Sequence, residues 1–423
     1  MLRRTGLSVL AATVLVDMIG FGIVLPLLPF YAEDLGATPF EVTLIIASFS
    51  AMQLVAAPLW GRFSDRRGRR PLIIAGLFAS AVSYLIFALA NSIAILLLSR
   101  IAAGAAGGTI SVAQAYVADS TEGSERAHGL GLIGAASGLG IMIGPAIGGF
   151  FAQWGLGAPG YVAAGLCALN AVAAIVALPE SRHFRDRAER AVTADAAGDG
   201  TGEAGTLAGW ARSLVRFPLG LLLAVYFLTI SSFAAMTSVL ALYTERVFAM
   251  TASQMGLVFT VAGAVTVVVR GVAVGKLVNR VGEAVTVRMG SVILAVSVGA
   301  IGLIPGKWWL ALLIPFWALA TGILFPSLAS LVSQATDADS QGSILGGSQL
   351  AGGMGRVLGP LWAGLLFQHH RIASPFLAGA VLSAAAFLLA LRIPTRGDAG
   401  GVRAWSGRLA TPEHADAVDP AGS

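Results

Sequence analysis

Two copies of one motif decide how this chain is organised: Gly61-Arg62-Phe63-Ser64-Asp65-Arg66-Arg67-Gly68 and, 214 residues later, Gly275-Lys276-Leu277-Val278-Asn279-Arg280-Val281-Gly282. A second pattern, two glycines four apart followed by a proline, stands at 140–145 and again at 355–360, an offset of 215 residues. Two independent motifs with nearly the same period indicate a duplicated unit. Each copy holds the same ordinal place in its half, which predicts two parallel repeats around a central site.

The sequence around these motifs is strongly apolar. Of the 423 residues, 56% are hydrophobic and 12% are charged, and the mean hydropathy is +0.81; soluble domains contain about 25% charged residues. A helix needs about 20 apolar residues to cross a bilayer, so the apolar runs indicate twelve crossings, six in each half. We expect them at 7–31, 42–60, 72–90, 93–117, 129–152, 161–178, 219–242, 253–275, 285–304, 308–332, 343–367 and 373–392.

These crossings predict the fold class and its divisions. We expect an all-α membrane protein whose 12 transmembrane helices form two pseudo-symmetric six-helix bundles, residues 1–180 and 218–394. A polar cytoplasmic linker, 181–217, joins them, and a polar cytoplasmic tail, 395–423, follows. The first apolar run resembles a secretory signal peptide at its start, but it continues to Tyr31, so we expect a retained helix.

The basic residues predict the orientation of the chain. With both termini in the cytoplasm, 21 of the 27 lysines and arginines would lie on the cytoplasmic side, three opposite and three within apolar runs. Short loops rich in these residues stay in the cytoplasm, so we expect a multi-pass protein of the inner membrane. The same bias accounts for the net charge of +5 and the pI near 9.8 without a nucleic-acid partner.

The sequence argues against several kinds of site. Its single cysteine, Cys167, excludes an internal disulfide framework, a four-cysteine zinc site and an iron–sulfur cluster, and His369-His370 alone forms no convincing metal site. The G-x-G-x-x-G pattern at 129–134 opens an apolar helix and follows no strand, and the glycine-rich run at 271–277 lacks the serine or threonine of an ATP-binding loop. We therefore expect neither an enzyme nor a cofactor or metal.

The first copy of the repeated motif also carries a family resemblance. Its glycines permit a tight turn between helices, and its aspartate can face cations or helix amino ends. The pattern resembles the cytoplasmic loop signature of the major facilitator superfamily, specifically of its twelve-helix drug:proton antiporters, which include tetracycline-efflux pumps. The matching residues are Gly61, Asp65, Arg66, Gly68, Arg69 and Arg70.

The resemblance implies an ionic latch at this loop. It implies that Asp119, which ends the fourth crossing, pairs with the loop signature, so that Asp65, Arg69 and Asp119 hold the cytoplasmic side closed. The second copy of the motif has Asn279 and Glu283 at the corresponding positions, so the latch should be stronger in the first half. Exposed ion pairs contribute only about 0–1 kcal/mol each, and an ordinary solvated helix end is the alternative interpretation of Asp119.

The fifth expected crossing contains a glycine motif. Its spacing of four places three glycines on one helix face, and its proline removes a backbone donor where the helix can bend. The residues are Gly140, Gly144, Pro145, Gly148 and Gly149. The pattern resembles the antiporter motif of the same family, which implies efflux rather than uptake. Simple packing through small residues is the alternative, and the two are physically compatible.

Two charged residues lie deep in apolar runs of the first half. Asp17 is about ten residues, or roughly 15 Å, into the first crossing, where an ionised aspartate costs about 2.5–3.5 kcal/mol; this predicts reversible protonation. The sequences around Asp17 and Arg100 resemble the first helix and the buried arginine of these antiporters, which implies a role in proton coupling. Arg100 is expected roughly 10 Å nearer the outer face, so direct contact needs helix tilt or water. The alternatives are a permanently paired carboxylate and an arginine that extends to the outer interface.

Further polar residues inside the apolar runs have less specific roles. Arg270 and Arg356 are buried cations without an assigned acid partner, and we interpret Arg270 as structural. Some polar and aromatic residues are candidates for the wall of a substrate cavity, although each alone is more often a packing residue. They are Gln53, Gln114, Asn170, Tyr226, Phe233, Trp317 and Gln349.

Together these observations predict a secondary transporter. It would export a hydrophobic or amphipathic small molecule, such as a tetracycline-like drug, in exchange for protons by alternating access. Its partners would be that substrate, protons and the lipid bilayer, and we expect a functional monomer. One alternative is proton-coupled or facilitative uptake of a small metabolite. Another is a transport-fold sensor or scaffold without flux.

Overall fold

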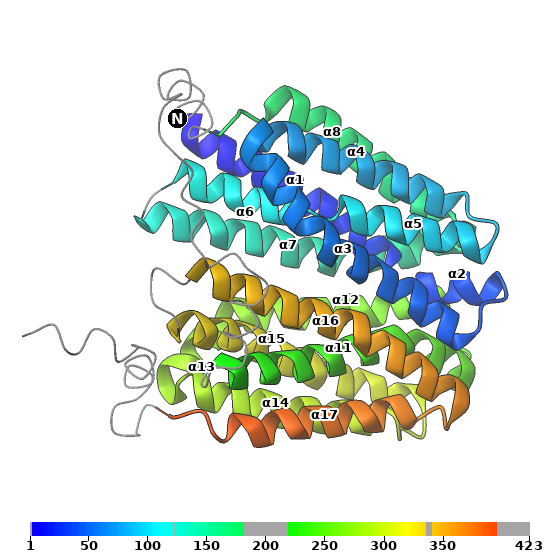
Figure 1. Ribbon diagram of the computed structural model, residues 1–423. Coiled ribbons are helices and arrows are strands. Elements are labelled where there is room, and N and C mark those ends of the chain that lie inside the picture. The colour runs from blue at the N-terminus through cyan, green and yellow to red at the C-terminus, as the bar shows by residue number, and fades with distance from the viewer. Residues whose placement is uncertain (1, 122, 182–218, 336–340, 396–423) are drawn as a thin grey trace, which may run out of the picture.

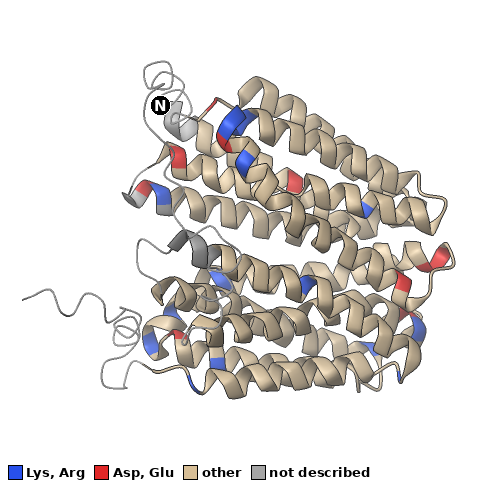
Figure 2. Cartoon of the chain, viewed as in Figure 1, with Lys and Arg blue, Asp and Glu red and all other residues tan. Residues whose placement is uncertain are grey.

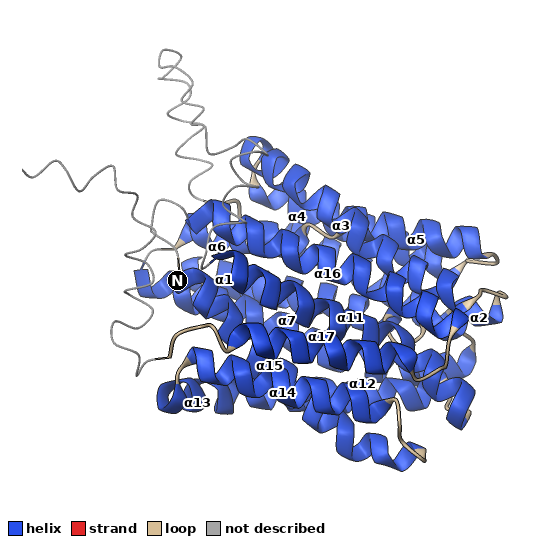
Figure 3. Ribbon diagram, turned by 60° about the horizontal axis from the view of Figure 1, so that its bottom comes forward, coloured by secondary structure: helices blue, strands red, loops and turns tan. Residues whose placement is uncertain are grey.

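A computed structural model gives the fold and describes residues 2–121, 123–181, 219–335 and 341–395. Within these ranges the chain is helical and contains no strand (Figure 3). Eleven of the described helical segments are long and apolar enough to cross a membrane, and one further apolar helix, Ser374–Ala390, is shorter, with 17 residues. The expected linker and tail lie, apart from their first residues, outside the described ranges.

The helices follow the predicted apolar runs closely. In the first half they are α1 (Leu2–Val24), α2 (Leu28–Asp34), α3 (Pro39–Arg67), α4 (Arg69–Ala88), α5 (Ile93–Ala106), α6 (Thr109–Ser120), α7 (Gly123–Phe151) and α8 (Ala158–Ala177). In the second half they are α11 (Leu219–Phe248), α12 (Ala252–Val268), α13 (Val274–Val281), α14 (Glu283–Ile301), α15 (Leu310–Gln334), α16 (Gln341–His369) and α17 (Ser374–Ala390). A short π-helical segment, Val269–Ala273, joins α12 to α13.

Two of the predicted crossings consist of two helices each. The crossing at 7–31 breaks between α1 and α2 beside Pro26, which has no backbone donor for a continuous helix. The crossing at 93–117 breaks between α5 and α6, where Trp60 of α3 occupies the space that a side chain on Gly108 would need. Each pair, α1 with α2 and α5 with α6, still forms one candidate membrane span.

The helices lie side by side in two groups that follow the order of the sequence (Figure 1). Helices α1 to α8 occupy the upper part of the view, and α11 to α17 occupy the lower part. In the first group α1 packs against α7 and α8; in the second, α11 packs against α16 and α17. Between the groups, α7 packs on α12 and α3 packs on α16. The duplicated sequence therefore produces the same pattern of packing twice.

The two copies of the repeated motif also form the same turn. Gly68, between α3 and α4, has φ of +94°, and Gly282, between α13 and α14, has φ of +83°. This backbone region is open essentially to glycine alone, which explains why each copy ends in glycine. The expectation that Gly61 helps to form the turn is wrong, because Gly61 lies inside α3.

Charged residues gather at the two ends of the helices and are sparse between them (Figure 2). One end carries Asp65 and Arg69 and is called the Asp65 end; the other carries Glu33 and Arg246 and is called the Glu33 end. Between the ends, large apolar side chains such as Leu169 are exposed on the outside of the bundle. Extensive exposed apolar surface of this kind indicates contact with lipid.

Candidate functional site

A cavity of about 570 Å³ lies where α7 of the first half meets α11, α12 and α15 of the second half. Its volume is in the range that drug-sized ligands occupy. The wall is apolar and aromatic apart from three threonines and one arginine. Because residues from both halves line it, a movement of one half against the other would change its shape.

The cavity begins where α7 and α12 are in close contact and extends from there toward the Asp65 end. At this contact, Ser253 Oγ of α12 donates a hydrogen bond to Gly149 O of α7 at 2.6 Å. The two backbones are so close there that a methyl group on Gly256 would stand 2.6 Å from Pro145 O. Farther toward the Asp65 end, α7 lines the cavity with Gly131, where an added methyl group would meet no atom within 4 Å.

Two more contacts join the halves at the Glu33 end. Arg246 Nη2 of α11 lies 2.6 Å from Glu33 Oε1 of α2. The backbone N–H of Phe40, in α3, donates to Gln368 Oε1 of α16 at 3.1 Å. The halves are therefore in contact at the Glu33 end, with the cavity beyond that contact.

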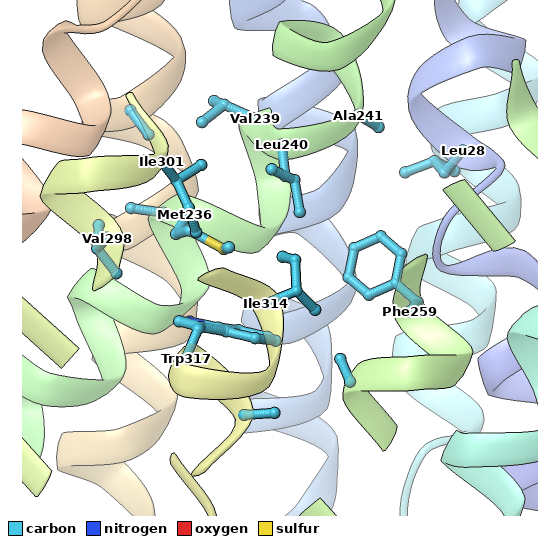
Figure 4. Close-up of a cluster of buried hydrophobic side chains, with 14 of the residues drawn as sticks. Leu28, Met236, Val239, Leu240, Ala241, Phe259, Val298, Ile301, Ile314 and Trp317 are labelled. Atoms are coloured by element: carbon cyan, nitrogen blue, oxygen red, sulfur yellow. The ribbon is translucent and has the colours of Figure 1, made fainter. Parts of the chain in front are cut away.

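One wall of the cavity is a cluster of aromatic rings. Phe233 and Trp317 are stacked, with ring centroids 5.3 Å apart and an interplanar angle of 2°, and Phe325 meets Phe233 edge-on at 5.4 Å. Figure 4 shows Trp317 and Ile314 of α15 beside Phe259 of α12. Phe233 and Trp317 were predicted to line a substrate cavity, and both lie in the wall of the cavity described here.

Asp17 is enclosed within the first half, between α1, α4 and α8. Its side chain is buried, with 6% exposed, and Ser80 of α4 hydrogen-bonds its carboxylate. One turn farther along α1, a methyl group on Gly20 would stand 3.1 Å from both Tyr84 of α4 and Cys167 of α8. This face of α1 differs from the one that packs on α7, so the acid and the cavity lie on different sides of α1.

Arg100 of α5 is also buried, with 5% exposed, and lies among aromatic rings. Its guanidinium carbon is 4.9 Å from the ring centre of Phe87 and 5.8 Å from that of Tyr84, and its Nε donates to Ser99 Oγ at 3.2 Å. Within the described ranges it forms no ion pair with Asp17, and its Nη2 has no acceptor. Tyr84 is the neighbour that Asp17 and Arg100 share.

At the Asp65 end, Arg69 joins the residues predicted for the latch. Its Nη1 lies 2.7 Å from Asp65 Oδ1, and its Nε lies 2.8 Å from Asp119 Oδ2. Ser64 Oγ accepts a further hydrogen bond from Nη1 at 3.0 Å. The predicted ion pairs are present, but both tie α3, α4 and α6 of the first half together and neither joins the two halves. That they hold the cytoplasmic side closed stays a prediction. Arg66, from the same motif, is exposed.

Glu180, which no motif in the sequence marks, stabilises the turn before α4. Its Oε1 accepts hydrogen bonds from the backbone N–H groups of Arg69 at 2.9 Å and Arg70 at 3.1 Å. A carboxylate at the amino end of a helix accepts hydrogen bonds from backbone N–H groups that have no partner within the helix. Its negative charge is also attracted to the positive end of the helix dipole. Because Glu180 lies 111 residues beyond Arg69, no local pattern could have revealed this contact.

The turn at Gly68 gives a matched test of these contacts. A methyl group on Gly68 would stand 2.9 Å from Glu180 Oε2 and would force a glycine-only conformation on alanine. We expect Gly68→Ala to lower the free energy of unfolding by about 1–3 kcal/mol, measured from thermal unfolding in detergent. Gly61→Ala, in the same motif but inside α3 with no atom within 4 Å, should leave stability unchanged or raise it slightly. Equal effects of the two substitutions would contradict this account of the turn.

The glycine motif of α7 packs as its spacing predicts. Three of its glycines face α1: a methyl group on Gly140 would stand 2.5 Å from Met18 Cβ, one on Gly144 would stand 2.6 Å from Gly22 Cα, and one on Gly148 would overlap the backbone of α1. Gly149 faces the other way, toward α12. The motif therefore lets α7 approach both its own half and the opposite one.

The sequence profile of the Major Facilitator Superfamily matches residues 10–360. The chain belongs to this superfamily. Multidrug resistance protein 2 of Bacillus subtilis (strain 168) is 29% identical to it over 384 residues, which are 90% of this chain and 93% of that protein. Tetracycline resistance protein, class C, of Escherichia coli is 28% identical over 418 residues, 97% of this chain and 100% of that protein.

Solved structures of the superfamily share the fold. The human organic anion transporter MFSD10 (TETRAN) is 25% identical, with a TM-score of 0.65 over 92% of this chain and 99% of that one. A mutant of the nucleoside transporter NupG is 12% identical, with a TM-score of 0.76 over the same shares, which is a likeness of fold alone. The all-helical membrane fold that the sequence predicted from its apolar runs is thus shared with these solved structures.

Two other residues predicted for the cavity of this superfamily member hold helices together instead. Gln53 Nε2 of α3 donates to Gly107 O, at the break between α5 and α6, at 3.2 Å. Asn170 of α8 is buried, and its Nδ2 donates to Thr13 O of α1 at 2.8 Å. These amides satisfy carbonyl groups inside the first half, which is the packing role that the sequence analysis gave as the alternative.

The remaining predicted cavity residues do not line the cavity described above. Gln114 and Gln349 are exposed. Tyr226 of α11 lies beside α16, where a methyl group on Gly352 would stand 2.8 Å from its Cε1 and 3.5 Å from Arg356 Nη1. Tyr226 and Arg356 are therefore neighbours, a pairing that their positions 130 residues apart in the sequence do not suggest.

Proposed function

We propose that this member of the superfamily exports amphipathic small molecules in exchange for protons. The observation that carries the proposal is the match, over nearly the full chain, to proteins named for multidrug and tetracycline resistance. The cavity supports it, because an aromatic and apolar wall suits such substrates. Asp17 supports it as well, because a carboxyl group buried in a membrane bundle is a natural carrier of a proton.

The proposal includes a topology. The chain crosses the cell membrane twelve times in two six-helix units, residues 1–180 and 218–394, with both termini in the cytoplasm. Eleven candidate spans and the shorter apolar helix support the count, and the repeated packing of α7 on α1 and α16 on α11 supports the duplication. The concentration of lysine and arginine on one side supports the orientation. One chain supplies the whole cavity wall, so a monomer would suffice.

In this topology the Asp65 end faces the cytoplasm, and the structure represents an inward-facing state. Export then requires the halves to part at the Glu33 end and to close at the Asp65 end. Parting would break the pair between Arg246 and Glu33 and the contact between Ser253 and Gly149. At the Asp65 end, the pairs made by Arg69 keep α3, α4 and α6 together, so that these helices move as one gate.

We propose that Asp17 couples this movement to protons through helix packing. Asp17 contacts α4 on one side of α1, and the glycines of α7 pack on another side. Because α7 lines the cavity, a change at Asp17 can reach the substrate through α1 and α7 without direct contact. Protonation from the outside removes a buried charge and favours the state that releases substrate, and loss of the proton inside resets the cycle. Arg100, with Tyr84 between it and Asp17, is the second member of this coupling site.

Inside-out membrane vesicles test the function directly. With an imposed proton gradient, addition of tetracycline or of a cationic dye to vesicles that contain the protein should release protons from the lumen, and vesicles without it should not respond. The readout is recovery of fluorescence from a probe that is quenched by the gradient. Substrate addition that draws protons together with substrate would indicate uptake by symport. Binding without flux of protons or substrate would indicate a sensor or scaffold.

A further inference from the structure

Arg270 is the charged residue of the cavity wall. Of the described residues that line the cavity, it alone carries a charge. It lies in the π-helical segment Val269–Ala273, which interrupts the run of α12 into α13. Such segments are rare and occur frequently at functional sites, because they change which side chain a helix presents. The expectation of a buried Arg270 is wrong, because its side chain is exposed. Its place in the cavity wall does not support the purely structural role that the sequence suggested for it.

Arg270 has no acidic partner in the part of the chain that the structure describes. Its polar neighbour is Tyr226 of α11, which it shares with Arg356 of α16. Arg356 also forms no ion pair among the described residues. On this side of the cavity the described parts of α11, α16 and the π-helical segment thus carry two arginines, neither of which is paired with a described carboxylate. A cation so placed within a membrane bundle favours a ligand that brings the opposite charge.

The other polar groups of the wall leave Arg270 as its main hydrogen-bond donor. Thr237, Thr266 and Thr321 each donate their hydroxyl hydrogen to a carbonyl of their own helix, at 3.0, 2.9 and 3.1 Å. Their hydroxyl hydrogens are therefore already used. An arginine offers five N–H donors in a planar fork that matches a carboxylate and pairs with it more strongly than with a neutral acceptor.

The aromatic cluster lies close enough to Arg270 to contact the uncharged part of a ligand whose negative group pairs with that arginine. Helix α15 packs on the π-helical segment through Gly322, where a methyl group would stand 2.8 Å from Val269 Cγ1. On α15, Gly322 lies between Trp317 and Phe325. Arg270 follows Val269, which contacts Gly322, so Arg270 lies at the same height along the bundle as these aromatic rings. A planar ring stacked on that wall could direct an acidic substituent to the guanidinium group.

We propose that this cavity binds planar aromatic molecules that carry a carboxylate or a comparable oxyanion, with Arg270 as the residue that pairs with the negative charge. The aromatic rings of Phe233, Trp317 and Phe325 hold the planar part. This inference rests on the proposed function, since the transported molecule has to occupy the cavity. It narrows the substrate class, because a cationic dye finds the same aromatic wall but no acid in the described lining.

Two dyes with the same ring system and opposite charges test this inference. Fluorescein is a xanthene whose attached phenyl ring carries a carboxylate. Rhodamine 123 has the same skeleton, but its carboxyl group is a methyl ester and its xanthene carries a positive charge. With the purified full-length protein in detergent, we expect Arg270→Gln to weaken fluorescein binding by about tenfold or more, as loss of a charged hydrogen-bond partner does. Rhodamine binding should change by less than about twofold, measured for both dyes by fluorescence anisotropy. Arg270→Lys should restore part of the fluorescein affinity, and Lys276→Gln, which removes an exposed cation beyond the cavity, should not alter it.

The outcomes separate this inference from the proposed function. Fluorescein binding that is absent from the wild-type protein, or unchanged by Arg270→Gln, overturns the inference. If, with either of these results, inside-out vesicles still transport rhodamine in exchange for protons, the proposed export function is retained and only the inferred substrate class is wrong. If neither dye binds and no substrate moves protons, the proposed function fails and the inference fails with it. The retained binding of rhodamine by Arg270→Gln shows that the variant is folded.

Discussion

Replacing Asp17 by asparagine is expected to abolish most of the proton-driven export while leaving substrate binding intact. Asparagine keeps the shape of the side chain and can still hydrogen-bond Ser80, but it cannot take up and release a proton. Typical coupling free energies correspond to roughly 5–150-fold, so we expect export against a gradient to fall by at least fivefold. In inside-out vesicles, substrate should no longer release protons, and export should become insensitive to the imposed pH difference.

A matched aspartate controls for the loss of charge. Asp34, at the end of α2, is exposed and lies outside the coupling site, so Asp34→Asn should export at the wild-type rate. Asp17→Glu, which keeps an ionisable carboxyl group, should retain part of the proton-driven flux. Equal coupling in Asp17→Asn and wild-type protein would remove Asp17 from the proposed mechanism, even if the protein proved to be an exporter.

The fold was accessible from the sequence because lipid imposes simple rules. Apolar runs have to become helices in a bilayer, so their positions predict the spans to within a few residues. The repeated glycine at 68 and 282 predicted a repeated turn, because few other residues adopt its backbone conformation. The breaks at Pro26 and Gly108 were harder to predict. Proline is tolerated inside α7 and α15, and the break at Gly108 depends on a tryptophan from another helix.

The candidate site was less accessible, because it depends on which face each helix turns inward. The ion pairs of Arg69 were predictable from the motif and its resemblance to a family. Asn170 and Phe233 look alike as candidates in the sequence, since both lie within apolar runs. Yet one bonds a carbonyl of α1 and the other lines the cavity. The place of Arg270 in the cavity wall was not predicted, because a π-helical segment shifts the helical register and no composition rule marks such a segment in advance.

At the Glu33 end, a glycine of one half packs against a threonine of the other. Gly364 of α16 and Thr43 of α3 are both buried there, and a methyl group on Gly364 would overlap Thr43 Oγ1 and stand 2.9 Å from its Cβ. Phe40 and Gln368 hydrogen-bond on the same pair of helices. In the proposed cycle this contact forms in the inward-facing state and is broken in the outward-facing one. A larger residue at Gly364 should therefore oppose that state without opposing the outward-facing one.

Gly364→Thr is expected to lower export by at least about tenfold, because close packing leaves no room for the added atoms and overpacking costs about 1–3 kcal/mol or more. The double variant Thr43→Gly with Gly364→Thr moves the bulk to the other helix and should recover most of the flux. Gly346→Thr, on the same helix where an added methyl group meets no atom within 4 Å, should export normally. All variants should unfold at similar temperatures in detergent, since the outward-facing state stays available. If the double variant folds but recovers no export, the contact between Thr43 and Gly364 does not control the cycle. If Gly364→Thr exports as fast as the wild-type protein, the halves do not close at this contact during transport.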